Sequence, residues 1–139
     1  MNKPRILIID DSPTVLQTLK GKLEEAGYEV TATTQTVGVA RYLSKVDLVI
    51  IDYHMPGVSG AEVLESLRAA AAHTEHRVSF YLYTLNEDIA SKYQKLGFDG
   101  CFTGKGDDNA LVTQVDAAFR LIRLRSLSSG RGSSGGGGE

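Results

Sequence analysis

The sequence contains very little cysteine, proline and tryptophan. Its 139 residues include one cysteine, three prolines and no tryptophan. A single cysteine excludes an internal disulfide and is typical of a reducing compartment, so we expect a cytoplasmic protein. Cys101 falls inside an expected strand. We expect it to be buried and inert rather than reactive, because apolar surroundings favour the neutral thiol.

Long apolar runs and an excess of charge of one sign are also missing. Fifteen Lys and Arg residues stand against 17 Asp and Glu residues, which gives a formal net charge of −2. This balance provides no electrostatic basis for binding nucleic acid. Residues 1–5 lead only into a short apolar run. We therefore expect no signal peptide, no membrane span and no nucleic-acid partner.

The composition changes near the end of the chain. The hydrophobic fraction of 42% is enough for one core, and the length suits one domain. From Ser126 onward serine and glycine dominate, and such a segment has few apolar side chains to bury. We expect a single domain over residues 1–125 and a disordered Gly/Ser-rich tail over residues 126–139.

Short apolar runs alternate with segments of helical periodicity. We expect strands at residues 5–9, 28–33, 46–51, 78–84 and 100–103. Helices are expected after Ser12, over residues 36–43 and 60–71, from Asn86 to Gly97, and around residues 111–122. This alternation predicts an α/β fold, a doubly wound five-stranded parallel sheet with right-handed crossovers. The second strand alternates in polarity, which indicates a position near an edge.

Polar residues follow the carboxyl ends of four of these strands. Asp10 and Asp11 follow the first strand, Asp52 the third, Thr84 the fourth, and a loop with Lys105 the fifth. Neighbouring parallel strands would bring these groups to one crevice. Three crowded carboxylates repel one another, and a cation that prefers oxygen ligands, such as Mg²⁺, would relieve that conflict. A hydroxyl and an ammonium suit phosphoryl oxygens, so the assembly indicates a metal-assisted site where a carboxylate accepts a phosphoryl group.

The order and spacing of these residues resemble the receiver domain of response regulators from bacterial two-component signalling. The resemblance covers residues 4–125, and within the family the sequence is similar to single-domain receivers of the chemotaxis-regulator type. It includes the acidic pair Asp10-Asp11, Thr84, and the run from Asp52 to Gly60, which matches the pattern D-x-x-M-P-x-x-[SD]-G. The family has a flavodoxin-like sheet of strand order 2-1-3-4-5. That order agrees with an outer second strand.

The resemblance implies a role for each matching residue. Asp52 would be the phosphoacceptor that attacks a phosphohistidine of a histidine kinase or phosphotransfer protein. Asp11, Asp52 and the main-chain carbonyl of His54 would ligate Mg²⁺, and Asp10 would hold a metal-bound water. Thr84 would hydrogen-bond the phosphoryl oxygen. The chemistry would be self-catalysed phosphotransfer and dephosphorylation at Asp52, without a dedicated enzyme.

The loop after the fifth strand departs from the family pattern. The family lysine precedes a proline, and counting from Gly97 and Gly100 places it on Gly104 rather than Lys105. If the loop bulges by one residue, as two flanking glycines permit, Lys105 contacts the phosphoryl group. The alternative is that Lys105 is an exposed loop lysine.

Three further positions leave questions open. Leu85 stands where the family has a small residue and is expected to crowd the approach to Asp52. The side chain of His54 is expected to point to solvent, although it could instead reach the phosphoryl group. The aromatic switch residue of the fifth strand falls on Cys101 or Phe102, depending on register, and we interpret Phe102 as a core residue.

Three functions compete at this point. The first is a phosphorylatable receiver of a two-component or phosphorelay system, a monomer or weak dimer that signals to a downstream protein target. The second is a degenerate receiver that acts as a phosphorylation-independent interaction module, which the displaced lysine and Leu85 would favour. The third is a generic flavodoxin-like ligand-binding domain. It is the weakest, because no glycine-rich phosphate loop follows the first strand.

Overall fold

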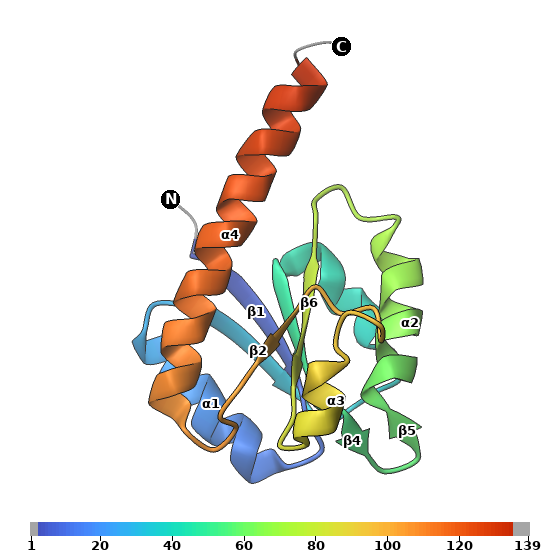
Figure 1. Cartoon of the computed structure of the whole chain (residues 1–139), viewed down its shortest axis with the longest axis vertical. Coiled ribbons are helices and arrows are strands. Elements are labelled where there is room, and N and C mark those ends of the chain that lie inside the picture. Colours follow the sequence, from blue (N-terminus) through green and yellow to red (C-terminus); the bar gives the residue numbers. More distant parts are fainter. Residues whose placement is uncertain (1–2, 135–139) are drawn as a thin grey trace.

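Five parallel strands form the central sheet of the structure, a computed structural model that describes residues 3–134 (Figure 1). Their order is β2-β1-β3-β6-β7, and every neighbouring pair is parallel. This confirms the predicted order 2-1-3-4-5, since β6 and β7 are the fourth and fifth strands of the sheet. The bounds are Arg5–Ile9 for β1, Glu29–Thr33 for β2, Leu48–Ile51 for β3, Ser79–Tyr83 for β6 and Gly100–Phe102 for β7.

Helices cover both faces of this sheet (Figure 1). Helices α1 and α4 pack on one face, and the 3₁₀ helix η1, α2 and α3 lie over the other. The strands serve both layers because their side chains alternate: Ile6 and Ile8 enter the first core, and Leu7 and Ile9 enter the second. The helix bounds are Pro13–Glu25 for α1, Val39–Lys45 for η1, Gly60–Ala71 for α2, Glu87–Ser91 for α3 and Asp108–Ser134 for α4.

Side chains at the helix starts explain where the helices begin. Ser12 Oγ accepts a hydrogen bond from Val15 N at 3.2 Å, directly before Pro13. At α2, Ser59 and Glu62 form a reciprocal capping box. These caps fix the two helices that follow the acidic strand ends.

The structure corrects several predicted elements. The expected second helix is the 3₁₀ helix η1, which starts after Gly38 in the left-handed conformation. Only Glu87–Ser91 of the expected fourth helix is α-helical, because Lys92, Tyr93 and Gly97 donate to carbonyls three residues back and form successive turns. A short hairpin of β4 (His54–Met55) and β5 (Val58–Ser59) lies between β3 and α2, where no strand was predicted.

The last helix is longer than the sequence predicted. It continues to Ser134, so residues 126–134 are helical and differ from the disordered tail expected there. Extending an existing helix costs far less than nucleating one, which offsets the poor composition. Residues 135–139 lie outside the described residues, and the domain boundary at residue 125 stays a prediction. Within residues 3–134 no helix combines the length and apolar character needed to cross a bilayer.

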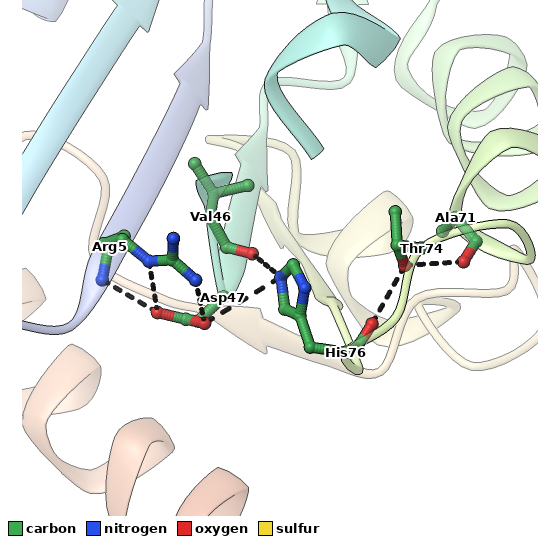
Figure 2. Close-up of polar contacts among 6 residues, drawn as sticks. All are labelled: Arg5, Val46, Asp47, Ala71, Thr74 and His76. Atoms are coloured by element: carbon green, nitrogen blue, oxygen red, sulfur yellow. Dashed lines mark hydrogen bonds and ion pairs between the residues drawn. The ribbon is translucent and has the colours of Figure 1, made fainter. Parts of the chain in front are cut away.

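A polar cluster closes the amino end of the sheet (Figure 2). Asp47 accepts hydrogen bonds from Arg5 N and from the Arg5 guanidinium at 3.1 to 3.3 Å. His76 Nε2 lies 2.6 Å from the carbonyl oxygen of Val46 and 4.0 Å from Asp47 Oδ1. Arg5, Asp47 and His76 are called the amino-end cluster below. It ties the start of β1 to the loops that precede β3 and β6.

Candidate functional site

Two buried carboxylates stand at the opposite, carboxyl end of the sheet. Asp10 directly follows β1, and Asp52 directly follows β3. The main chain holds both, because Asp52 N donates to Ile9 O at 2.9 Å and Asp10 N to Thr33 O at 3.3 Å. The acids therefore extend the strand ladders, and their side chains have little freedom to move away from each other.

The loop after Asp52 folds back on itself tightly. Gly60 N donates to Tyr53 O at 2.7 Å. A Cβ atom at position 60 would lie 2.6 Å from the main-chain oxygen of Asp52 and 2.8 Å from Tyr53 Cα, closer than real Cβ contacts come. Glycine is required at this position because the start of α2 packs directly against the strand end that carries Asp52.

Asp10, Asp11 and Asp52 together form a cluster that can hold a metal ion. One carboxylate oxygen from each lies within 4.8 Å of the others. Asp10 and Asp52 are buried and Asp11 is exposed, and Ser12 N donates to Asp10 Oδ1 at 3.0 Å. The donor set consists of carboxylate oxygens, with an open side at Asp11. Such a set fits Mg²⁺, which prefers hard oxygen ligands and keeps several of its waters.

Lys105 reaches this cluster from the loop after β7. Its Nζ donates to Asp10 Oδ2 at 2.9 Å and to Asp52 Oδ1 at 3.0 Å, and its side chain is 13% exposed. The alternative of an exposed loop lysine is therefore wrong. Gly104 and Gly106 on either side have φ of 70° and 108°. This left-handed backbone lets the chain absorb the extra residue.

The charges of this site influence one another strongly. Burial raises the pKa of Asp52, the hydrogen bond and charge of Lys105 oppose that rise, and the charges of Asp10 and Asp11 add to it, so the pKa stays above its ordinary value. For Lys105, burial acts to lower the pKa, but the hydrogen bonds and charges of Asp10 and Asp52 outweigh it and raise the pKa. The ammonium is thus held charged beside a surplus of carboxylates.

A cleft of about 390 Å³ opens over Asp52, and its lining includes Thr84, Leu85 and Lys105. Thr84 is buried and its Oγ1 accepts a hydrogen bond from Asn86 N at 3.2 Å. Leu85 is 76% exposed, so its side chain lies on the rim of the cleft instead of filling it. The cleft brings a carboxylate, a hydroxyl and an ammonium to one opening.

His54 lies in the short hairpin beside this cleft. Its side chain is exposed, as predicted, and its ring meets the ring of Tyr53 edge-on at 5.1 Å. A second opening of about 510 Å³ has Asp11, His54 and Glu62 in its wall. The role of the His54 main-chain carbonyl as a metal ligand stays a prediction.

The aromatic residues of β6 and β7 belong to the two cores on either face of the sheet. Phe102 is buried and stacks on Tyr81 with ring centroids 4.7 Å apart, which confirms its interpretation as a core residue. Tyr83 is 2% exposed and packs under α1 and α4, with Lys105 Nζ 5.4 Å from its ring centroid. Cys101 is half-buried on the other face, where burial raises its thiol pKa, in line with the expected inert thiol.

Sequence reasoning missed one residue that shapes the site. Gln114 on α4 binds the main chain of Thr103, two positions before Lys105. Nothing in the local pattern marks Gln114, because its partner lies 11 residues away, directly after β7. The hairpin after Asp52 was also missed, although its Pro56-Gly57 pair is a turn signal.

Comparisons with known proteins agree with this geometry. The family model described as the response regulator receiver domain matches residues 6–116. Among curated proteins, the DNA-binding dual master transcriptional regulator RpaA of Synechocystis is 32% identical over 89% of this chain and 48% of its own length. The transcriptional regulatory protein FixJ of Azorhizobium caulinodans is 31% identical over 89% of this chain and 57% of its own length. The chain thus spans about half the length of these relatives.

Solved structures share the fold. The signal receiver domain of a LuxO repressor protein from Vibrio parahaemolyticus has a TM-score of 0.75 at 21% identity, over 91% of this chain and 98% of its own. The response regulator TrrA of Thermotoga maritima, in complex with Mg²⁺ and BeF, has a TM-score of 0.68 at 28% identity. That match covers 82% of this chain and 97% of the TrrA chain.

Proposed function

Because the chain belongs to the response regulator receiver domain family of two-component signalling, we propose that Asp52 accepts a phosphoryl group from a histidine kinase or phosphotransfer protein. The observation that carries this proposal is the position of Lys105 Nζ, 3.0 Å from Asp52 Oδ1 in the cleft that Thr84 also lines. A nucleophilic carboxylate with a cation and a hydroxyl beside it is what transfer of an anionic group to oxygen requires.

The carboxylate cluster supports Mg²⁺ as the cofactor. Asp11 and Asp52 would ligate it directly, with the His54 carbonyl as a further ligand, and Asp10 would hold one of its waters. When bound, the ion would neutralise the clustered carboxylates and draw charge from the phosphoryl oxygens. The complex of TrrA with Mg²⁺ and BeF is a property of that relative and supports the same cofactor here.

The residues of this chain supply the remaining chemistry. A carboxylate oxygen of Asp52 forms the bond to phosphorus as the bond from phosphorus to the donor histidine nitrogen breaks, and that nitrogen keeps the electron pair. Lys105 and Thr84 donate hydrogen bonds to the phosphoryl oxygens, which carry the negative charge throughout the transfer. In this proposal the receiver domain itself catalyses the modification of Asp52 and the later hydrolysis of the phosphorylated carboxylate.

Phosphorylation would change how the domain binds a downstream protein. The relatives RpaA and FixJ are named as transcriptional regulators, but this chain covers only about half of each. We therefore propose a protein target and no nucleic-acid contact for this domain, with its formal net charge of −2. A cytoplasmic location and a monomer or weak dimer complete the proposal, in a two-component or phosphorelay pathway.

Mass spectrometry with a small phosphodonor tests this function. With Mg²⁺ and phosphoramidate, the wild-type protein should gain one phosphoryl group, and Asp52→Asn should gain none. Asp47→Asn, a matched change at the other end of the sheet, should be modified like the wild type. If the wild-type protein gains no mass and does not respond to beryllofluoride, the proposal fails, and a phosphorylation-independent interaction module becomes the better explanation.

A further inference from the structure

The end of β7 lies at an edge of the sheet. Among the described residues β7 pairs with β6 alone, so no strand of residues 3–134 lies on its outer side. At Thr103, directly after β7, the carboxamide of Gln114 takes that place: its Oε1 accepts from Thr103 N at 2.9 Å, and its Nε2 donates to Thr103 O at 2.8 Å. One side chain thus pairs both polar main-chain groups of a residue, as a neighbouring strand would.

Further contacts hold Gln114 in this orientation. Its Oε1 also lies 3.3 Å from Thr103 Oγ1, and its Nε2 lies 3.2 Å from Ala110 O on its own helix. The side chain is half-buried between α4 and the strand end. Both the oxygen and the nitrogen of the Gln114 carboxamide are therefore hydrogen-bonded, and the side chain links α4 to the residue that follows β7.

The segment that follows Thr103 has little else to define it. Gly104 and Gly106 flank Lys105, and glycine gives the backbone its widest freedom. On the far side Asp107 fixes the loop, since its N donates to Gly104 O at 2.9 Å and its Oδ1 accepts from Ala110 N at 3.0 Å. The main chain on either side of Lys105 is thus held by hydrogen bonds at Thr103 and at Asp107.

We propose that Gln114 is the positioning residue of Lys105. Gln114 does not touch the carboxylates. It fixes the point from which the loop starts, and so places the ammonium between Asp10 and Asp52, where it can meet a phosphoryl group. The expected effect of Gln114 on the phosphorylation rate rests on the proposed function. Its effect on the order of the Lys105 side chain can be measured without phosphorylation.

The expected effect is moderate because the hydrogen bonds lie near the surface. Losing the hydrogen bonds between Gln114 and Thr103 should destabilise the ordered loop by about the net free energy of one hydrogen bond. A rate that depends on the ordered loop should then fall about threefold to tenfold. The loss should be smaller than that caused by removing the ammonium itself.

Gln114→Met is the sharpest variant, since methionine keeps the length and helix preference and lacks both polar atoms. Its control is Thr113→Ala, because Thr113 Oγ1 donates only within α4, to Asn109 O at 3.3 Å. Three quantities are measured: the initial rate of phosphorylation by phosphoramidate, the affinity for Mg²⁺, and the mobility of Lys105 Cε from ¹³C relaxation. Gln114→Met should lower the rate, leave the Mg²⁺ affinity unchanged and raise the Lys105 mobility, whereas Thr113→Ala should match the wild type.

A double variant separates positioning from a general effect on the fold. In a Lys105→Met background, Gln114→Met should lower the phosphorylation rate no further. A further loss of the same size in that background would overturn the inference, as would unchanged Lys105 mobility in Gln114→Met. If the wild-type protein is not phosphorylated at all, the proposed function fails, and the mobility of Lys105 still decides this inference. Should Gln114→Met not fold, Gln114→Glu, which loses the donor to Thr103 O, serves in its place with the same expected mobility change.

Discussion

The two ends of the parallel sheet use acids and bases in opposite ways. In the amino-end cluster one carboxylate, Asp47, meets one guanidinium, Arg5, and their side chains are 28% and 33% exposed. At the carboxyl end three carboxylates lie close together beside one ammonium, Lys105, which is 13% exposed. The first arrangement balances charge near solvent, whereas the second gathers excess negative charge where solvent is scarce.

Polar side chains near the two ends show a related difference. At the amino end, charged or aromatic side chains satisfy the main chain: Asp47 accepts from Arg5 N, and His76 binds Val46 O (Figure 2). At the carboxyl end the hydroxyl of Tyr83 is buried and forms no hydrogen bond within the described residues. The comparison teaches that the amino end is arranged for stability. The carboxyl end keeps repulsion between clustered carboxylates, which a bound metal ion would relieve.

The largest difference should follow from removing the cation at each end. Lys105→Met should lower the rate of phosphorylation by phosphoramidate about 100-fold, because it removes a donor to the transferred group. Arg5→Met should leave that rate within about twofold, since the Arg5 guanidinium donates to Asp47 at the opposite end of the sheet from Asp52. The measurement is the initial rate of phosphorylation of each variant and of the wild type at saturating Mg²⁺. Equal losses in the two variants would show that the two ends do not differ in function.

A smaller effect, on stability, should follow from removing Asp47. Asp47→Ala should lower the free energy of unfolding by about 1–2 kcal/mol, because Asp47 binds both the main-chain N and the guanidinium of Arg5 at a partly exposed site. Urea unfolding measures the change, and Glu65→Ala, at an exposed position of α2, shows what an ordinary acid-to-alanine change costs. A loss no larger than a few tenths of a kcal/mol would contradict the stabilising role of the amino-end cluster.

Much of the fold and of the site could be predicted from the sequence. Continuous apolar strands such as β3 are buried on both faces, and an alternating strand such as β2 is expected near an edge, so the pattern indicates which strands are central and which is outer. The full strand order comes from the resemblance to the receiver family. The acids follow from position, because Asp10 and Asp52 end buried runs. The motif from Asp52 to Gly60 is recognisable in the sequence, but the β4–β5 hairpin within it was not predicted, and the close contact that requires Gly60 is visible only in the structure.

The remaining features depend on contacts that the local sequence does not contain. The location of the Lys105 ammonium requires left-handed backbone at Gly104 and a partner on α4, Gln114, and neither is visible in a five-residue loop. Helix α3 ends at Ser91, where Lys92 and Tyr93 bond to carbonyls three residues back, and no residue of the local pattern marks that point.

A third prediction concerns the unpaired hydroxyl. Burial raises the pKa of Tyr83 and outweighs the opposite effect of the nearby main-chain N–H of Gly106, so the hydroxyl stays neutral. Its oxygen is buried and makes no hydrogen bond of ordinary geometry among the described residues. Tyr83→Phe should raise the free energy of unfolding by up to about 1 kcal/mol, because it removes a desolvated donor and keeps the ring beside Lys105. Tyr28→Phe is the matched control and should be destabilising, since the Tyr28 hydroxyl binds Asp116. A loss of stability in Tyr83→Phe would show that its hydroxyl is satisfied in solution.

The smallest change should come from Asp52→Asn without Mg²⁺, because two contributions oppose each other. The variant loses the charge that binds Lys105, but it also loses a carboxylate that burial and the nearby acids disfavour. The raised pKa of Asp52 shows that the second contribution is larger. The folded state therefore binds the Asp52 proton more tightly than the unfolded state does, and wild-type stability falls as pH rises from the ordinary carboxyl value of 3.8 through the raised pKa.

Asp52→Asn lacks this dependence, so it should be slightly more stable than the wild type at pH 7, and the difference should shrink as pH falls through the raised pKa of Asp52. Urea unfolding at several pH values, with a chelator present, measures it. Asp47→Asn should be less stable than the wild type at pH 7, because its carboxylate is paired with Arg5. Adding Mg²⁺ should stabilise the wild type more than Asp52→Asn. If Asp52→Asn is the less stable protein at pH 7, Lys105 balances the carboxyl end as fully as Arg5 balances the amino end, and the contrast between the two ends does not hold.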